Sequence, residues 1–207
     1  GIRIELENGE PVYKGVVFNE MKGAMSSPSD QLYHQLAHHL FPKTTYHYNA
    51  GGDPKDIPDL TYQELVDFYK SHYHPSNAIF MTFGNQSAYE LQEQFETLAL
   101  SRFEKGQTIH SIHEQRLTAP IAVTETYAVD AEDLKDKTYH ILSWLLPESS
   151  DTKLRLGLRL AEGILREDSA SPLRHYLETC GYAQSTGPIM GLDDSNFEMT
   201  FYCGIQG

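Results

Sequence analysis

The chain has 207 residues, of which 40% are hydrophobic and 11% aromatic; this composition is globular and excludes a disordered chain. Its formal net charge of −13 argues against nucleic acid as the main partner, because phosphate contacts need Lys and Arg. The charge instead suits a basic peptide or a cationic surface. Two cysteines are too few for a disulfide framework, and no run of residues is long and apolar enough to span a membrane.

The first half of the chain predicts an opening strand, four helices and a second strand. Alternating apolar and charged residues at 2–6 predict the opening strand. The helices are predicted to begin near Gly15, at the cap Ser27, at the capping box Thr61–Glu64 and at the cap Ser87. The short apolar run Ala78–Phe83 predicts a strand between the last two helices.

A polar, His-rich stretch at 105–118 has no apolar period and predicts a linker between a domain at 1–104 and a second domain at 119–207. The second domain is predicted to contain strands at Ile121–Val129 and Tyr139–Leu146, helices at 154–165 and 171–180, and two strands around the turn Gly191–Ser195. Pairs of strands followed by pairs of helices indicate an α+β layer fold rather than a wound parallel sheet. Both ends are strand-like and lack a polar tail, so we expect a piece of a longer protein.

The helix predicted after Gly15 carries an acid on its apolar side. At about 100° per residue, Glu20 falls inside an apolar arc, between Val16 and Ala24. An ionised carboxylate that loses water there needs a cation or several hydrogen-bond donors, and a metal ion is the strongest such partner. The alternative is that Glu20 lies at the rim of the arc and reaches solvent.

Three groups of histidines invite a search for a metal site. His34 and His38 have the helical spacing that lets two imidazoles share an ion, but no Glu stands beside the first one as a base, so a solvated helix face is the simpler interpretation. His110 and His113 lie in the predicted linker and are interpreted as surface residues. The segment His72–Pro75 marks a helix end, where His favours the helix dipole.

Several longer motifs resemble the presequence proteases, members of the insulinase (pitrilysin) family of inverted-zincin metallopeptidases. The motifs that carry the resemblance are Lys14–Gly23, Gly51–Pro54 with Ile57–Thr61, His72–Ala78, and Ser171–Leu173 with Gly181–Ala183. They extend from about Tyr13 to Gly181, which is most of the chain. The resemblance implies an insulinase-type antiparallel sheet packed with helices, in two incomplete homologous domains.

The resemblance also implies a chemistry. In this family two His residues of an inverted H-x-x-E-H motif bind zinc, the Glu between them is the general base, and a downstream Glu is the third ligand. On this resemblance Glu20 is the downstream zinc ligand. The implied substrates are unstructured peptides, including basic targeting peptides, and the implied compartments are the bacterial cytoplasm or the mitochondrial or plastid matrix.

The chain departs from the family where the chemistry takes place, because it contains no H-x-x-E-H motif. None of the residues before Glu20 is a histidine, so the general base and the zinc-binding pair are expected upstream of Gly1. We therefore expect this chain to bind zinc weakly or not at all, to cleave nothing alone, and to need the missing N-terminal and C-terminal parts as partners. The alternative function is that of a non-catalytic structural or assembly subunit with the same fold.

Overall fold

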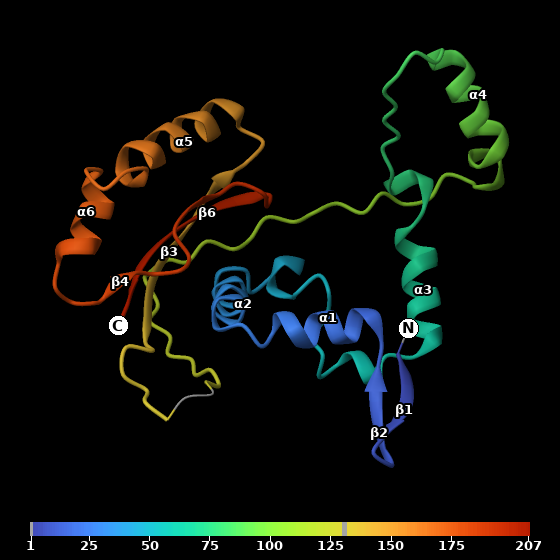
Figure 1. The fold of residues 1–207 in the computed structure, drawn as a ribbon. Coiled ribbons are helices and arrows are strands. Elements are labelled where there is room, and N and C mark those ends of the chain that lie inside the picture. Colours follow the sequence, from blue (N-terminus) through green and yellow to red (C-terminus); the bar gives the residue numbers. More distant parts are fainter. Residues whose placement is uncertain (1, 130–131) are drawn as a thin grey trace. The chain divides into compact units, whose positions relative to one another are not determined.

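The computed structural model describes residues 2–129 and 132–207, and these form two compact units. The first unit combines Gly1–Ile57 with Ile112–Gly207, and the second is Pro58–Ser111. The chain contains helices and antiparallel sheets (Figure 1), which confirms the predicted α+β class. The linker at 105–118 is predicted to separate two homologous domains. Homology is a statement about common ancestry, and a division into compact units does not test it, so this division stays a prediction.

The first unit contains most of the regular structure. Its elements in chain order are β1 (Arg3–Glu7), β2 (Glu10–Lys14), α1 (Val16–Ala24), α2 (Pro28–Leu40), the 3₁₀ helix η1 (Thr45–His47), β3 (Tyr139–Glu148), α5 (Thr152–Arg166), α6 (Pro172–Thr179), β4 (Ser185–Thr186), β5 (Gly191–Asp193) and β6 (Glu198–Gln206). Strands β1 and β2 form a hairpin whose turn residues Asn8 and Gly9 both have positive φ, as a tight Asn-Gly turn requires. As predicted, Ser27 caps α2, where its hydroxyl accepts a hydrogen bond from the Asp30 amide.

Strand β6 is the centre of the main sheet. It pairs antiparallel with β3 along one edge and with β4 and β5 along the other, and most of its residues are buried. The predicted strand at 139–146 is therefore confirmed as β3, and the strand predicted after the turn Gly191–Ser195 is confirmed as β6. The strand predicted before that turn is misplaced, because β5 lies at Gly191–Asp193, inside the predicted turn. Helices α5 and α6 follow one another along this sheet in Figure 1 and contact β5 and β4 respectively.

The core of the first unit lies where the end of α2 meets the sheet. Leu40 and Phe41, at the end of that helix, pack with Tyr202 of β6, and Phe41 is fully buried. The ring of Tyr46 lies 5.3 Å from that of Phe41, and its hydroxyl accepts a hydrogen bond from the amide of Phe197. Burial of these aromatic side chains removes apolar surface from water and stabilises the unit.

Two buried glutamates attach the segment after Ile112 to this core. The carboxylate of Glu114 accepts hydrogen bonds from the backbone amides of Lys43, Thr44 and Gln115 at 2.7–3.0 Å. The amide of Glu114 in turn donates to the carboxylate of Glu198 at 2.9 Å. Backbone donors of this kind are what a buried carboxylate needs in place of water.

Replacing Glu114 by Gln is expected to lower the free energy of unfolding by about 2–3 kcal/mol. The amide group of Gln places two donors where the backbone already donates, so at least one buried amide loses its acceptor. Urea unfolding of the 207-residue chain measures the change, with Glu104→Gln, at an exposed position, as the matched control. Equal midpoints for the two variants would contradict the role of Glu114.

The second unit holds α3 (Tyr62–His72), the 3₁₀ helix η3 (Pro75–Asn77), α4 (Ala88–Leu98) and η4 (Leu100–Arg102), while η2 (Ile57–Asp59) crosses into it from the first unit. The capping box of Thr61 and Glu64 is present at the start of α3, as predicted. Helix α4 begins directly after Ser87, although the Ser87 side chain makes no capping hydrogen bond.

Two predicted strands are wrong for the chain as described. Residues Ala78–Phe83 and Ile121–Val129 form no strand in this structure. In the first segment Ile79, Met81 and Phe83 are each more than nine-tenths exposed. A strand exists only when a neighbour accepts and donates its backbone hydrogen bonds, and neither segment has such a neighbour among the described residues.

The predicted linker is tied to its surroundings at several points. In the second unit the amide of Gly106 donates to the Ser76 hydroxyl and the amide of Ile109 to the side chain of Asn77. In the first unit Arg116 donates to the carbonyls of Leu145 and Leu146 near the end of β3. The stretch at 105–118 is thus extended and anchored by polar contacts on both sides of the boundary at residues 111 and 112.

Candidate functional site

The candidate metal ligand Glu20 lies on α1, a helix none of whose residues is buried. The expected burial of its carboxylate is not found: Glu20 is exposed, and Val16 and Val17 of the apolar arc are 81% and 52% exposed. Within residues 2–129 and 132–207, no hydrogen bond or ion pair joins the Glu20 side chain to another residue. The arc predicted from the sequence is therefore only partly covered by the described residues: Phe18, Met21, Ala24 and Met25 are half-buried, whereas Val16 and Val17 are exposed.

Two motifs that carry the family resemblance meet at α1. The side-chain amide of Asn49 lies 3.5 Å from the sulfur of Met21, the residue next to Glu20. A Cβ atom at Gly51 would lie only 2.1 Å from the same sulfur, so Gly is the residue that fits without moving the Met21 side chain. The loop Asn49–Gly52 therefore packs against the helix that presents Glu20.

The histidines do not assemble around Glu20. His34 packs its ring edge-on to Tyr33, whereas His38 packs against His39 and His47. His72 contacts the carbonyl of Phe68 at the end of α3, which fits the interpretation of its segment as a helix end.

The described residues do not form a complete metal site. Within the parts of the chain that the structure describes, no three side chains of His, Cys, Asp or Glu are placed to hold one ion. A zinc site needs at least three protein ligands, and Glu20 is available as one of them. No helix among the described residues has the length and hydrophobicity for a membrane span.

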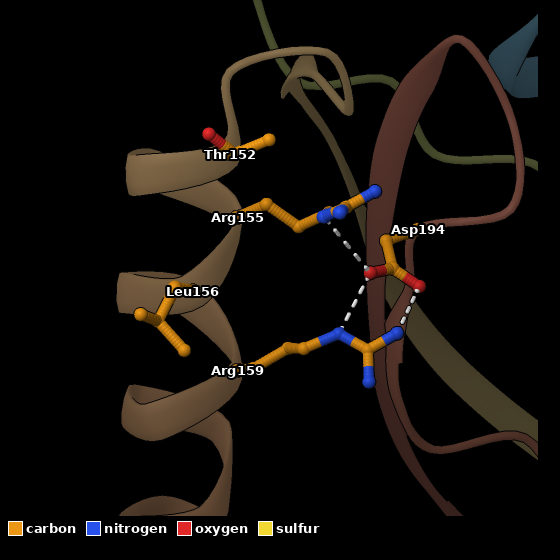
Figure 2. Close-up of a pocket in the computed structure, with 5 residues that line it drawn as sticks. All are labelled: Thr152, Arg155, Leu156, Arg159 and Asp194. Atoms are coloured by element: carbon orange, nitrogen blue, oxygen red, sulfur yellow. Dashed lines mark hydrogen bonds and ion pairs between the residues drawn. The ribbon is translucent and has the colours of Figure 1, made fainter.

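A shallow hollow lies beside α5, and Figure 2 shows the five residues that line it. Arg155 and Arg159 point from α5 toward Asp194, which follows β5, while Thr152 and Leu156 complete the wall. The Arg159 guanidinium donates two hydrogen bonds to the carboxylate at 2.7 and 2.8 Å. These hydrogen bonds, with the positive charge of Arg159, hold the pKa of Asp194 below its ordinary value. The hollow holds no nucleophile paired with a base, and its charges serve to join the turn after β5 to α5.

Replacing Asp194 by Asn is expected to reduce stability in a pH-dependent way. A carboxyl group whose pKa is lower in the folded state stabilises the fold above its unfolded pKa of 3.8, and this contribution is lost as the pH falls through the folded value. The variant should therefore have a lower Tm than the original chain at pH 6, and the gap should narrow toward pH 3. Asp56→Asn, at an exposed position, is the matched control. A constant gap from pH 6 to pH 3 would contradict the role of the charge.

Comparison with known proteins identifies the class of this α+β chain. The Peptidase M16 inactive domain matches residues 59–205. The chain belongs to the M16 peptidase family, which confirms the resemblance described from the sequence motifs.

The similar proteins include several presequence proteases. The chain is 36% identical over 198 residues to the mitochondrial presequence protease of Gibberella zeae, covering 95% of this chain and 19% of that protein. It is 35% identical over 199 residues to presequence protease 1 of Arabidopsis thaliana, covering 94% and 18%. It is also 35% identical over 184 residues to Protein HypA of Clostridium perfringens, covering 88% and 19%. The chain thus spans about a fifth of the length of these relatives.

A solved structure shares the fold. A protease from Helicobacter pylori matches 92% of this chain and 46% of its own chain, with a TM-score of 0.57 and 17% sequence identity. At this identity the likeness extends to the fold alone, and it supports the insulinase-type arrangement of helices on an antiparallel sheet.

Sequence reasoning missed two groups that the fold brings together. The buried pair of Glu114 and Glu198 joins residues 84 positions apart in the sequence, and no local pattern connects them. The ring of His47 packs on that of His38 across the turn after α2. The sequence feature that points to this contact is Phe41-Pro42, because a proline ends the helix there and lets the following segment turn back beside the helix end.

Proposed function

We propose that this chain is part of a zinc metalloendopeptidase that hydrolyses unstructured peptides, and that Glu20 supplies one zinc ligand. The observation that carries the proposal is the family membership, with similarity of 34–36% to presequence proteases over nearly the whole chain. A carboxylate is a ligand that zinc accepts, and Glu20 lies in the motif Lys14–Gly23 that resembles the ligand-bearing segment of these enzymes.

The exposed apolar arc of α1 supports this placement of Glu20. Val16 and Val17 are adjacent apolar side chains that are largely exposed, and exposure of an apolar patch to water is unfavourable. Since the chain spans about a fifth of its relatives, other parts of a full-length protein can cover the arc and bring the histidine pair and the general base. Unstructured peptides of basic character would suit the net charge of −13.

According to this proposal, the 207-residue chain alone has no peptidase activity. With no H-x-x-E-H motif and no group of three ligands among the described residues, the 207-residue chain is expected to show no peptide hydrolysis and at most weak zinc binding. Zinc analysis and hydrolysis of an unstructured basic peptide, with the chain and the full-length protein side by side, test this. Tight stoichiometric zinc in the chain alone, or a full-length protein without peptidase activity, would overturn the proposal.

The second candidate is a structural or assembly subunit of the same fold. It is favoured by the match to a domain described as inactive, which covers residues 59–205 and does not include Glu20. The two candidates differ in the full-length protein: a structural subunit would contain no zinc and would lack the upstream histidine pair.

A further inference from the structure

The turn after α2 gathers three imidazoles against one another. The rings of His38 and His47 have centroids 3.8 Å apart and are inclined by 36°, and the ring of His39 lies 5.2 Å from that of His38. His47 also donates from Nδ1 to the backbone carbonyl of His38 at 3.0 Å. The Nε2 atom of His47 is then its free ring nitrogen, and a positive charge on this ring would lie directly against His38.

Three charged or titratable groups face His38: His47 from η1, His39 from the same helix, and Glu125 from the segment at 121–129. The two imidazoles favour the neutral form of His38, whereas the Glu125 carboxylate favours the protonated form. The single carboxylate is committed to His39, whose Nε2 lies 3.1 Å from the Glu125 Oε1 atom. Partial removal of the ring from water, and then the charges of His47 and His39, lower the pKa of His38 from its ordinary 6.5.

The paired rings of His38 and His47 are connected to α1 through the η1 turn and the loop that follows it. The amides of His47 and Tyr48 donate to the carbonyls of Thr44 and Thr45 to form the η1 turn. The chain then passes directly into the loop Asn49–Gly52, which packs on Met21. A change at the stack is therefore transmitted first to η1 and then to this loop.

We propose that the stack of His38 on His47 is an acid-sensitive latch that holds η1 and the loop Asn49–Gly52 in place at neutral pH and releases them when both rings are protonated. Two imidazolium ions at stacking distance repel each other, and the nearby Glu125 is already paired with His39. The folded state disfavours the proton on His38. The neutral His38 ring therefore makes its full contribution to the free energy of unfolding above pH 6.5, and this contribution decreases as the pH falls below that value.

Hydrogen–deuterium exchange of the 207-residue chain at pH 7.5 and pH 5.5 tests the latch. After correction for intrinsic rates, the amides of His47 and Tyr48 should exchange on the order of tenfold faster at pH 5.5 in the original chain. His47→Phe keeps a ring in the stack but cannot be protonated, so its corrected rates should be nearly equal at the two pH values. His110→Phe, at an exposed position outside the stack, should behave like the original chain.

A second variant keeps the test decisive if His47→Phe does not fold. His38→Phe removes the other titrating ring and should also abolish the acid response. In the original chain, an NMR titration should place the midpoint of the His38 ring below 6.5, and His47→Phe should raise it. An original chain with no acid response, or a folded His47→Phe or His38→Phe variant that keeps it, would overturn the proposal.

Discussion

In the full-length protein, Glu20→Gln is expected to lower zinc content and peptide hydrolysis together, each by on the order of 100-fold. The change replaces an anionic ligand by a neutral amide of the same size, which a zinc ion binds far more weakly. Metal analysis after dialysis and initial rates on an unstructured peptide measure the two effects. Because Glu20 is exposed in the chain, its replacement should leave the folding of this part of the molecule unchanged.

The control for Glu20 is Glu10→Gln, an equally conservative change at an exposed acid on β2. It should leave zinc content and rate at their original values. A Glu20→Gln protein with full zinc and full activity would remove the ligand assignment while leaving the family membership intact. A protein with full zinc and a lost rate would instead place Glu20 among the residues that contact substrate.

In the 207-residue chain, Phe41→Ala is expected to lower the free energy of unfolding by about 3–5 kcal/mol. Phe41 is fully buried between the end of α2, Tyr46 and Tyr202, so its removal leaves a cavity in a cluster of buried side chains that joins helix and sheet. Urea unfolding followed by the fluorescence of Trp144 on β3 measures the loss.

The matched control is Phe83→Ala, which deletes the same side chain where it is fully exposed. That change should alter stability by less than about 0.5 kcal/mol. A loss at Phe41 no larger than the loss at Phe83 would mean that the end of α2 does not pack on β6 in solution.

Local chemistry explains which elements could be predicted. The cap Ser27 and the capping box of Thr61 and Glu64 act within one helical turn, so the residues that decide the structure stand next to one another in the sequence. The strands β3 and β6 were predictable because each has a long apolar pattern, although their mutual register was not.

Non-local partners explain what could not be predicted. The run Ala78–Phe83 has the residues of a strand, but pairing depends on a second strand that its own sequence cannot specify. The burial expected for Glu20 fails for a related reason: periodicity defines the apolar arc of α1 but does not supply the surface that covers it. The contact of His38 with His47 depends on the path of the turn between them, which composition leaves undetermined.

The first unit is interrupted in sequence by the second, and this order matters when the chain is made. Tyr46 and Phe197, which share a hydrogen bond beside the core, are 151 residues apart. On the ribosome α2 therefore emerges long before β6, and Phe41 has no strand to cover it during that interval. The apolar end of α2 therefore stays without its partner strand until β6 has been synthesised, so the first unit can close only late in synthesis, however fast its helices form.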